Sequence, residues 1–537
     1  MREFLINSWG KSADRNYSEE QWNAIVSYYK VLEKKAPKRP THEFVDDITW
    51  NDLDMDEVYQ VWNHTRTSIG EEYLYAALRR PIASDTEMEE RERVITYLLE
   101  NTQERMYLQE ALAEIGKLER MSVYDHLELI QDMKPIGALP HILAGVCLVG
   151  ALIGCAFAPE FMVIASIAIM GGNIISYYQA KAKVDSYIRL FTFILHMVEQ
   201  CEGVARKKIP GLEKYQDQLK KQTSCFGKYR RFCFLVNGGS GMSGDIMDSL
   251  MDYIRILFHV DLVKMSTMIR EAKKYEQQLR IMYDTIGYLD TMLSTASCRI
   301  MYGEYCVPQL SHQANGKFAV TEMYHPLIPE GVRNSITAER SVLLTGSNAS
   351  GKSTFIKTVA LNAILAQTLH TVLAENYQAS WFCIASSMAL RDDILSQESY
   401  YIVEIRSLKR ILDLTRLSEL PVLCFIDEVL RGTNTVERIA ASSRILQAIA
   451  EQGGLCFAAT HDIELTYLLE KEYDNYHFEE QVEDDKVTFD YCLHEGRACT
   501  RNAIRLLKML GYDEKIVDDA NERVALFLKS GNWVSSH

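Results

Sequence analysis

The sequence lacks several features that are typical of secreted proteins, of zinc-binding proteins and of proteins that bind nucleic acid over their whole surface. Its 12 cysteines are scattered with no C-x-x-C pair, which argues against a zinc site or disulfide framework and fits reduced cytosolic thiols. Prolines are few, and no low-complexity tract or internal repeat is present. The net charge of −15 excludes a chain-wide nucleic-acid surface, so any such contact needs a local basic patch. The opening residues show no signal-peptide pattern, and none is expected.

What is present indicates a folded, multidomain chain. Its 537 residues are too many for one core and predict about three or four domains. Residues 1–135 and 181–309 predict long helices of the kind that act as arms or levers. From residue 310 short β-rich runs alternate with helices, which predicts an α/β nucleotide-binding domain over 310–537.

An apolar segment at 136–180 interrupts the helical region. Residues 138–158 carry no charge and one histidine, and residues 161–178 are again uncharged. Each arm approaches the roughly 20 residues that cross a bilayer. A hydrophobic hairpin buried in the protein or in a dimer interface is the alternative. We predict a membrane hairpin over 138–178, with both chain ends on the cytoplasmic side because lysines flank the arms.

A glycine-rich run between an apolar stretch and a helix-like segment predicts a phosphate-binding loop. Backbone N–H groups of such a loop surround phosphates, and the following helix adds the positive end of its dipole. Lys352 is expected to reach the β- and γ-phosphates and Ser353 to hold Mg²⁺. The predicted nucleotide-binding residues are Gly346, Ser347, Asn348, Ala349, Ser350, Gly351, Lys352, Ser353 and Thr354.

Two further apolar runs end in groups suited to ATP hydrolysis. Residues 421–426 precede Asp427, expected to bind Mg²⁺ through water, and Glu428, expected to act as the general base. Residues 455–459 lead to His461, placed at a strand end where it can sense the γ-phosphate. An ordinary helix cap and a plain loop histidine are the alternatives. We predict catalytic roles for Glu428 and His461.

A basic strip lies between residues 206 and 231, with aromatic residues interleaved. It could contact a phosphate backbone, and a solvated helix face or attraction to anionic lipid are equal alternatives. The candidate DNA-binding residues are Lys207, Lys208, Lys220, Lys221, Arg230 and Arg231.

These motifs together resemble the MutS family of DNA mismatch-repair ATPases. The loop up to Thr354, the Asp427-Glu428 pair with the R-G-T at 431–433, and the A-T-H ending at His461 are similar to the family's motifs. The run from Ser399 to Glu404 resembles its signature segment. Residues 324–326 and Asn334 resemble the family's R-H-P and N-D positions. Residues 285–525 carry the resemblance well, and 45–100 more faintly.

The resemblance implies a helical core and lever region before a C-terminal α/β P-loop (ABC-type) ATPase domain. It implies ATP and Mg²⁺ as cofactors and a homodimer in which Ser399 serves the partner's nucleotide. The resemblance also implies that the protein binds DNA. Helical arms would hold the DNA as a clamp, and ATP binding and hydrolysis would switch the conformation of these arms. The stretch before residue 45 is too short for the family's mismatch-reading and connector domains, and Tyr400 and Tyr401 replace usual signature residues. The alternative function is a membrane-associated ATPase motor acting on a protein or lipid partner. Either way, a cytoplasmic ATPase held at a membrane through 138–178 is expected.

Overall fold

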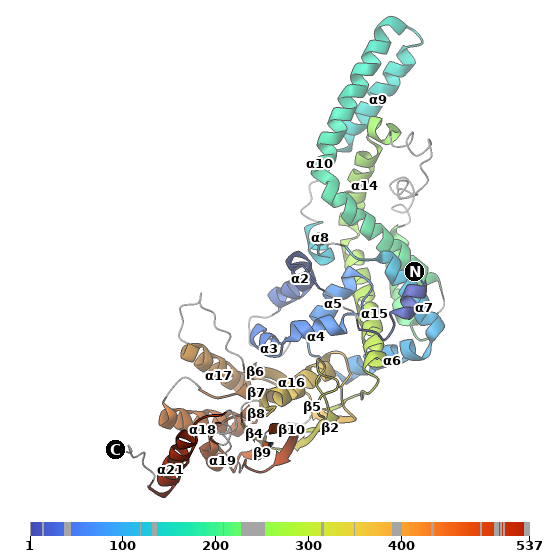
Figure 1. The fold of residues 1–537 in the computed structure, drawn as a ribbon. Helices are drawn as coiled ribbons and strands as arrows, with labels where there is room; N and C mark the ends of the chain where they lie inside the picture. The colour runs from blue at the N-terminus through green and yellow to red at the C-terminus, as the bar shows by residue number, and fades with distance from the viewer. Residues whose placement is uncertain are drawn as a thin grey trace. The chain divides into compact units, whose positions relative to one another are not determined.

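The computed structural model describes most of the chain, as two compact units (Figure 1). The described residues are 2–12, 16–36, 44–118, 120–130, 137–207, 209–226, 253–312, 316–347, 350–388, 400–430, 434–483, 486–498, 504, 507 and 511–530. One unit comprises residues 1–36, 62–76 and 93–301, and the other comprises residues 37–61, 77–92 and 302–537. The predicted multidomain fold, with a helical region followed by mixed α/β structure, is confirmed.

The first unit is built from helices. Its elements are α1 (Arg2–Asn7), α2 (Glu19–Lys35), α7 (Thr102–Ile115), α8 (Val123–Leu129), α9 (Ala138–Gly154), α10 (Pro159–Arg206), α11 (Glu213–Thr223), η1 (Ser224–Phe226), α14 (Val260–Lys274) and α15 (Glu276–Tyr302). Helices α5 (Ser68–Arg79) and α6 (Asp85–Glu100) belong partly to each unit. Local signals fix several ends, as at α2, where Ser18 and Gln21 form a reciprocal capping box.

Helix α15 forms the centre of this unit, with most of its residues buried. Its Asp290 is fully buried. Although it is far from α5 in the sequence, its carboxylate caps the start of that helix. The carboxylate accepts hydrogen bonds from the N–H groups of Arg66 and Thr67, at 2.9–3.0 Å, and from the Thr67 hydroxyl at 2.7 Å. Gly70 is required beside it, since a Cβ there would lie 2.2 Å from an Asp290 oxygen.

The Asp290 cap yields the first prediction, on stability. Asp290→Ala should lower the free energy of unfolding by about 3 kcal/mol, because it leaves buried donors without acceptors. Urea denaturation of the purified chain measures this. Asp217→Ala on the exposed face of α11 removes the same charge and should change stability little. A loss no larger than that of the control would contradict the capping role.

The described residues of the second unit form two sheets. Their strands are β1 (Gln309–Ser311), β2 (Phe318–Met323), β3 (Asn334–Ala338), β4 (Ser341–Thr345), β5 (Asn376–Ser380), β6 (Cys383–Ser387), β7 (Val422–Asp427), β8 (Leu455–Ala459), β9 (Tyr473–Glu483) and β10 (Lys486–Glu495). Its helices are α3 (Asp47–Asp52), α4 (Met55–Trp62), α16 (Lys352–Thr368), α17 (Tyr400–Leu417), α18 (Thr435–Glu451), α19 (Ile463–Leu468) and α21 (Glu514–Ser530).

The larger sheet has the order β10-β9-β4-β8-β7-β6, and the smaller has the order β1-β5-β2-β3. In the larger sheet every pair except β9/β10 is parallel. Strands β4 and β8 are buried along their whole length, as continuous apolar runs in a covered parallel sheet should be. Strands β4, β8 and β7 are neighbours, so their carboxyl ends meet at one edge.

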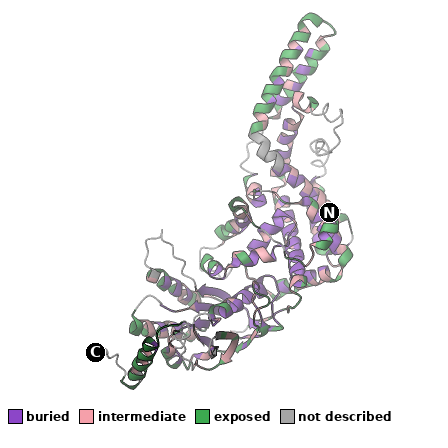
Figure 2. Ribbon diagram, viewed as in Figure 1, coloured by how far each residue is buried: buried purple, intermediate pink, exposed green. Residues whose placement is uncertain are grey.

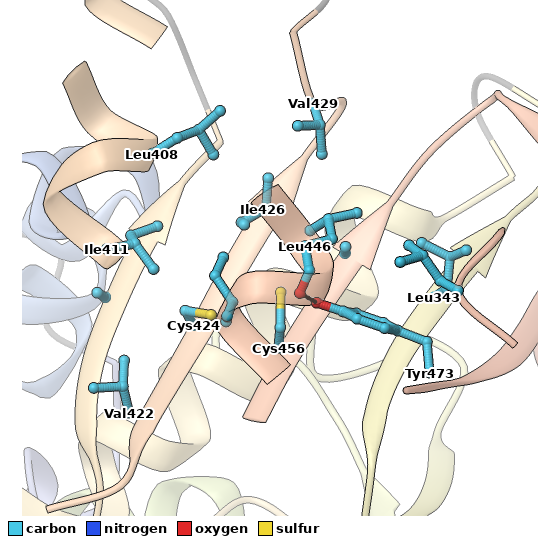
Figure 3. Close-up of a cluster of buried hydrophobic side chains, with 14 of the residues drawn as sticks. Leu343, Leu408, Ile411, Val422, Cys424, Ile426, Val429, Leu446, Cys456 and Tyr473 are labelled. Carbon is cyan, nitrogen blue, oxygen red and sulfur yellow. Dashed lines mark hydrogen bonds between the residues drawn. The ribbon is translucent and has the colours of Figure 1, made fainter. Parts of the chain in front are cut away.

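One face of this sheet packs against α17 and α18 (Figure 3). Cys424 of β7 and Cys456 of β8 are register partners at its centre, and neither is exposed. The Tyr473 side chain crosses the cluster, and its hydroxyl donates a 2.9 Å hydrogen bond to the carbonyl of Leu446. This core holds the strands whose ends carry Asp427 and His461.

Two early helices belong to this second unit. Asp52 of α3 accepts hydrogen bonds from the Ser386 hydroxyl at 2.6 Å and from the Met388 N–H at 2.9 Å. Thr49 accepts another from the Ser386 N–H. Residues far upstream of residue 310 therefore complete the end of β6.

The apolar segment folds as a helical hairpin of α9 and the first part of α10. Within the described residues, Pro159–Ala182 is the helical stretch long and apolar enough to cross a membrane, judged by length and composition. The other arm, α9, has 17 residues. Only 17% of the apolar window in Pro159–Ala182 is buried, so most of this window is not packed inside the described part of the chain.

Candidate nucleotide site

The predicted phosphate loop joins β4 to α16. Gly346 and Gly351 have φ angles of +147° and +105°, which residues with a Cβ rarely adopt, and this explains the two glycines. Asn348 and Ala349 lie outside the described residues. Lys352 is the first residue of α16, and Ser353 and Thr354 follow in its first turn.

The Lys352 ammonium is turned back into the loop. Its Nζ donates hydrogen bonds to the carbonyl oxygens of Gly346 at 2.8 Å and Ser347 at 2.7 Å. The Ser350 hydroxyl also donates to the Ser347 carbonyl, at 2.9 Å. Burial lowers the pKa of Lys352, while Asp427, Glu428 and Glu480 oppose that shift. The loop thus holds a buried cation facing three carboxylates.

Asp427 and Glu428 follow β7 at the same edge of the sheet. Burial raises the pKa of Asp427, and a hydrogen bond from the Ser353 side chain acts in the opposite direction. The structure thereby brings together the two residues predicted to hold Mg²⁺. A hydroxyl and a carboxylate are the hard oxygen donors that this ion prefers. Among the described residues no cluster of three His, Cys, Asp or Glu side chains offers a separate metal site.

Glu428 stands in a strained backbone conformation, with φ +56°. Its N–H donates to the Ala459 carbonyl at 3.0 Å, and its carboxylate lies 3.1 Å from Nε2 of His461. Leu430 also has a positive φ, and its N–H donates to the buried carboxylate of Glu404. Glu428 and His461 therefore come together from the ends of β7 and β8, as expected from the parallel order.

A pocket of about 320 Å³ opens beside the loop. Its walls come from the ends of β2 and β3 and their connection, the first two turns of α16, and strands β9 and β10. They are Met323, His325, Ile328, Gly331, Val332, Asn334, Gly351, Thr354, Phe355, Thr358, Phe478 and Tyr491. Burial, then the charge of Lys357, lowers the pKa of His325 to about 4, so its ring is neutral at pH 7. The pocket is mainly apolar and suits a flat ring.

Sequence reasoning missed two groups at this site. Glu480 of β9 is buried and accepts a 2.6 Å hydrogen bond from the Ser347 hydroxyl. Tyr491 lies at an irregularity in β10, and a Cβ on Gly351 would approach its ring to 3.2 Å. Asn334 fixes that irregularity by donating to the Tyr491 carbonyl at 3.0 Å and accepting from the Leu493 N–H at 2.7 Å. Only Asn334 carried a signal in the sequence.

Of the remaining predicted residues, some lie in the part of the chain that the structure describes and others lie outside it. Ser399, the R-G-T at 431–433, Lys208, Arg230 and Arg231 lie outside the described residues. Lys220 and Lys221 are exposed in the last turn of α11, and Lys207 lies 3.7 Å from the Tyr107 ring centroid. Gln216 of α11 donates to the carbonyl of Lys207 and thereby ties that residue to the same helix.

Comparisons with known proteins agree with the motifs found at this site. Residues 342–527 match the family model for MutS domain V. The DNA mismatch repair protein MutS of Streptococcus sanguinis strain SK36 is 25% identical over 516 residues, covering 86% of this chain. Over most of its length the chain is thus similar to MutS proteins, and over residues 342–527 it is similar to MutS domain V. This similarity agrees with the resemblance that its motifs carry.

Other MutS proteins show how far the likeness to the family extends. That of Thermotoga petrophila is 24% identical over 507 residues, covering 87% of this chain, and that of Pseudothermotoga lettingae is 32% identical over 249 residues, covering 44%. The chain spans 59% of the length of the Streptococcus MutS, 62% of the Thermotoga MutS and 30% of the Pseudothermotoga MutS. The match with the higher sequence identity, to the Pseudothermotoga MutS, therefore covers only part of this chain.

Proposed function

We propose that this MutS-like chain is a Mg²⁺-dependent ATPase whose nucleotide cycle switches a DNA-binding helical region. The observation that carries the proposal is the convergence at the ends of β4, β7 and β8. There the buried Lys352, the Ser353–Asp427 pair and the Glu428–His461 pair lie together, at the carboxyl ends of adjacent parallel strands and in the first turn of α16. Ligands of open α/β sheets bind at the carboxyl ends of strands.

The loop would hold the triphosphate and the adjoining pocket the base. Lys352 would exchange its bonds to the loop carbonyls for phosphate oxygens, which carry full charge and bind an ammonium more strongly. The pocket beside Gly351 would take the adenine ring against Phe355 and Tyr491. Ser353 would bind Mg²⁺ directly and Asp427 through water. Bound Mg²⁺ neutralises charge that develops on the transferring phosphoryl group.

Hydrolysis would use Glu428 as the general base. The oxygen of a water attacks the γ-phosphorus, the bond from that phosphorus to the bridging oxygen breaks, and Glu428 accepts the proton of the water. His461 contacts the Glu428 carboxylate and would hold it while standing near the γ-phosphate. The hydrogen bond from the Leu430 N–H to Glu404 holds the backbone two residues after Glu428.

A homodimer and DNA complete the proposed cycle. By resemblance, Ser399 of one subunit would serve the nucleotide of the other, so that ATP closes the dimer and hydrolysis opens it. The named relatives are DNA mismatch repair proteins, which supports DNA as the client. The exposed Lys207, Lys220 and Lys221 would neutralise backbone phosphates.

The second prediction tests DNA. ATP hydrolysis by the purified chain should rise on adding duplex, mismatched or branched DNA, and the apparent DNA affinity should fall as salt increases. Lys220→Ala/Lys221→Ala should reduce the slope of log affinity against log salt by about 1.8, at about 0.9 for each lost phosphate contact. Lys30→Ala/Lys34→Ala, on exposed positions of α2, removes the same charge as a control. If no DNA stimulates hydrolysis at low salt, DNA is not the client, whereas the ATPase proposal stands.

A further inference from the structure

The hairpin of α9 and α10 carries apolar side chains around most of its circumference. On α9 the buried residues form one narrow stripe: His141, Gly145, Leu148 and Ala151. The other positions face outward and include Leu143, Val146 and Ile153, with exposed fractions of 54%, 59% and 60%. Figure 2 shows the same pattern, with the outer surface of the hairpin mostly exposed.

This pattern selects among possible partners. A second protein copy packing beside the hairpin would bury one further stripe and leave the remaining apolar surface in water. Soluble helices place charged residues on such outer faces. Here Glu160 is the single Asp, Glu, Lys or Arg between residues 138 and 180. An apolar environment that surrounds the hairpin, in contrast, would cover the apolar side chains on all of its faces at once.

A layer of buried polar contacts crosses the hairpin near one end of the apolar zone. Nδ1 of His141 shares a 2.9 Å hydrogen bond with Nδ1 of His259, in the turn before α14, and Nε2 of His259 contacts the carbonyl of Asn173 at 2.8 Å. Asn173 donates to the carbonyls of Ala144 and Leu257. Close by, the Tyr177 hydroxyl donates to Asp261, and Lys181 lies 5.5 Å from the Tyr177 ring.

The other end is the tip, which carries Phe157, Glu160 and Phe161, all exposed. Ile142 to Gly154 is 13 residues, or about 20 Å at 1.5 Å per residue, and the connecting turn adds several Å. The distance from the polar layer to Glu160 thus approaches the about 30 Å of a hydrocarbon core, and local thinning accommodates the difference. Polar groups therefore lie near both ends of the hairpin, and the exposed side chains between them are mostly apolar.

We propose that a lipid bilayer is the partner of this surface and that the hairpin inserts into it from one side. The His141–His259–Asn173 layer stands at the near interface, Glu160 reaches toward the far headgroups, and both chain ends stay on the near side. The ATPase would then work at a membrane. This proposal depends on the hairpin alone and is independent of the nucleotide site.

Flotation of the full chain with vesicles tests insertion and gives the third prediction. The chain should float with phosphatidylcholine vesicles, with or without phosphatidylglycerol, and should remain bound in high salt. Val146→Glu/Ile167→Glu places two charges mid-hairpin at residues that are 59% and 65% exposed, so the soluble fold is unaffected. Membrane partition should fall at least about 100-fold. Leu417→Glu/Ile516→Glu adds equal charge at exposed positions outside the hairpin and should float like the parent.

Three outcomes would overturn the proposal. The chain could stay in the dense fraction and instead form hairpin-dependent dimers in lipid-free ultracentrifugation, which would make a second copy the partner. It could bind only vesicles with phosphatidylglycerol and wash off in salt, which would indicate surface adsorption. The charged hairpin variant could float as well as the parent while keeping the same circular dichroism.

A native thiol gives a second readout on the unmodified chain. Cys147 is exposed in the hairpin, and Cys225 is partly exposed outside it. A charged maleimide followed by peptide mass analysis should label both in lipid-free protein. Vesicles should protect Cys147 at least about tenfold and leave Cys225 unchanged, because the reagent does not enter hydrocarbon. Equal labelling of Cys147 with and without vesicles would refute insertion.

Discussion

Lys352→Ala is expected to weaken ATP binding at least about 100-fold. The ammonium makes two hydrogen bonds inside the loop and is buried. Each bond from a charged group contributes about 1.5–3 kcal/mol, so loss of two phosphate contacts costs about 3 kcal/mol or more. Titration calorimetry or a fluorescent ATP analogue measures the dissociation constant directly.

The matched control for this prediction is Lys357→Ala on the same helix. Lys357 is paired with Asp54 at 2.6 Å and does not line the pocket or the loop, so its removal should leave nucleotide affinity within about twofold. Equal affinity in the parent and in Lys352→Ala would show that the loop does not bind phosphate. A loss of affinity in the control alone would contradict the assignment as well.

Glu428→Gln should leave ATP binding intact and slow hydrolysis at least about 100-fold. The amide keeps the size of the side chain but cannot accept a proton from water, and general base catalysis contributes about 10²–10⁴ in rate. The experiment compares single-turnover hydrolysis with the dissociation constant for ATP. The variant should accumulate the ATP-bound form.

Glu437→Gln provides the control for this change. Glu437 is exposed in the first turn of α18, a short distance along the chain from Glu428, and should retain the parent rate. Undiminished hydrolysis by Glu428→Gln would remove Glu428 from the base role. A parallel loss of ATP binding would indicate that Glu428 positions the nucleotide instead.

The candidate nucleotide site was predictable because its parts are local motifs at the ends of apolar runs. A glycine loop before a helix and two acids after a strand are short patterns with their own chemistry. The parallel order of β4, β8 and β7 then brings Lys352, Asp427 and His461 to one edge. The alternation of short β-rich runs and helices was enough to expect that arrangement.

Other parts depend on contacts that no short pattern encodes. Glu480 reaches Ser347 across 133 residues of sequence, through the pairing of β9 with β4. Asp52 meets Ser386 across 334 residues. Such pairings depend on the register and packing of the whole unit, so a polar residue in a strand or a short helix carries no local sign of its partner.

For the hairpin, the sequence left two alternatives, membrane insertion or burial in protein. Composition alone cannot separate them, because both need uncharged residues over similar lengths. The exposure of Val146 and Ile167 on opposite arms is a property of the fold and argues against burial within this chain. The polar contacts of His141 with His259 likewise join residues 118 positions apart.

The cysteine pair in the sheet core has a practical consequence. The hydrogen bond with Cys456, together with burial, raises the pKa of Cys424 well above its usual range, so the thiol is both enclosed and protonated. An alkylating reagent can reach it only when the packing of this face against α17 and α18 opens. The rate of that modification therefore reports how often the core beside the strand bearing Asp427 opens, and it could follow the effect of nucleotide on local stability without any engineered label.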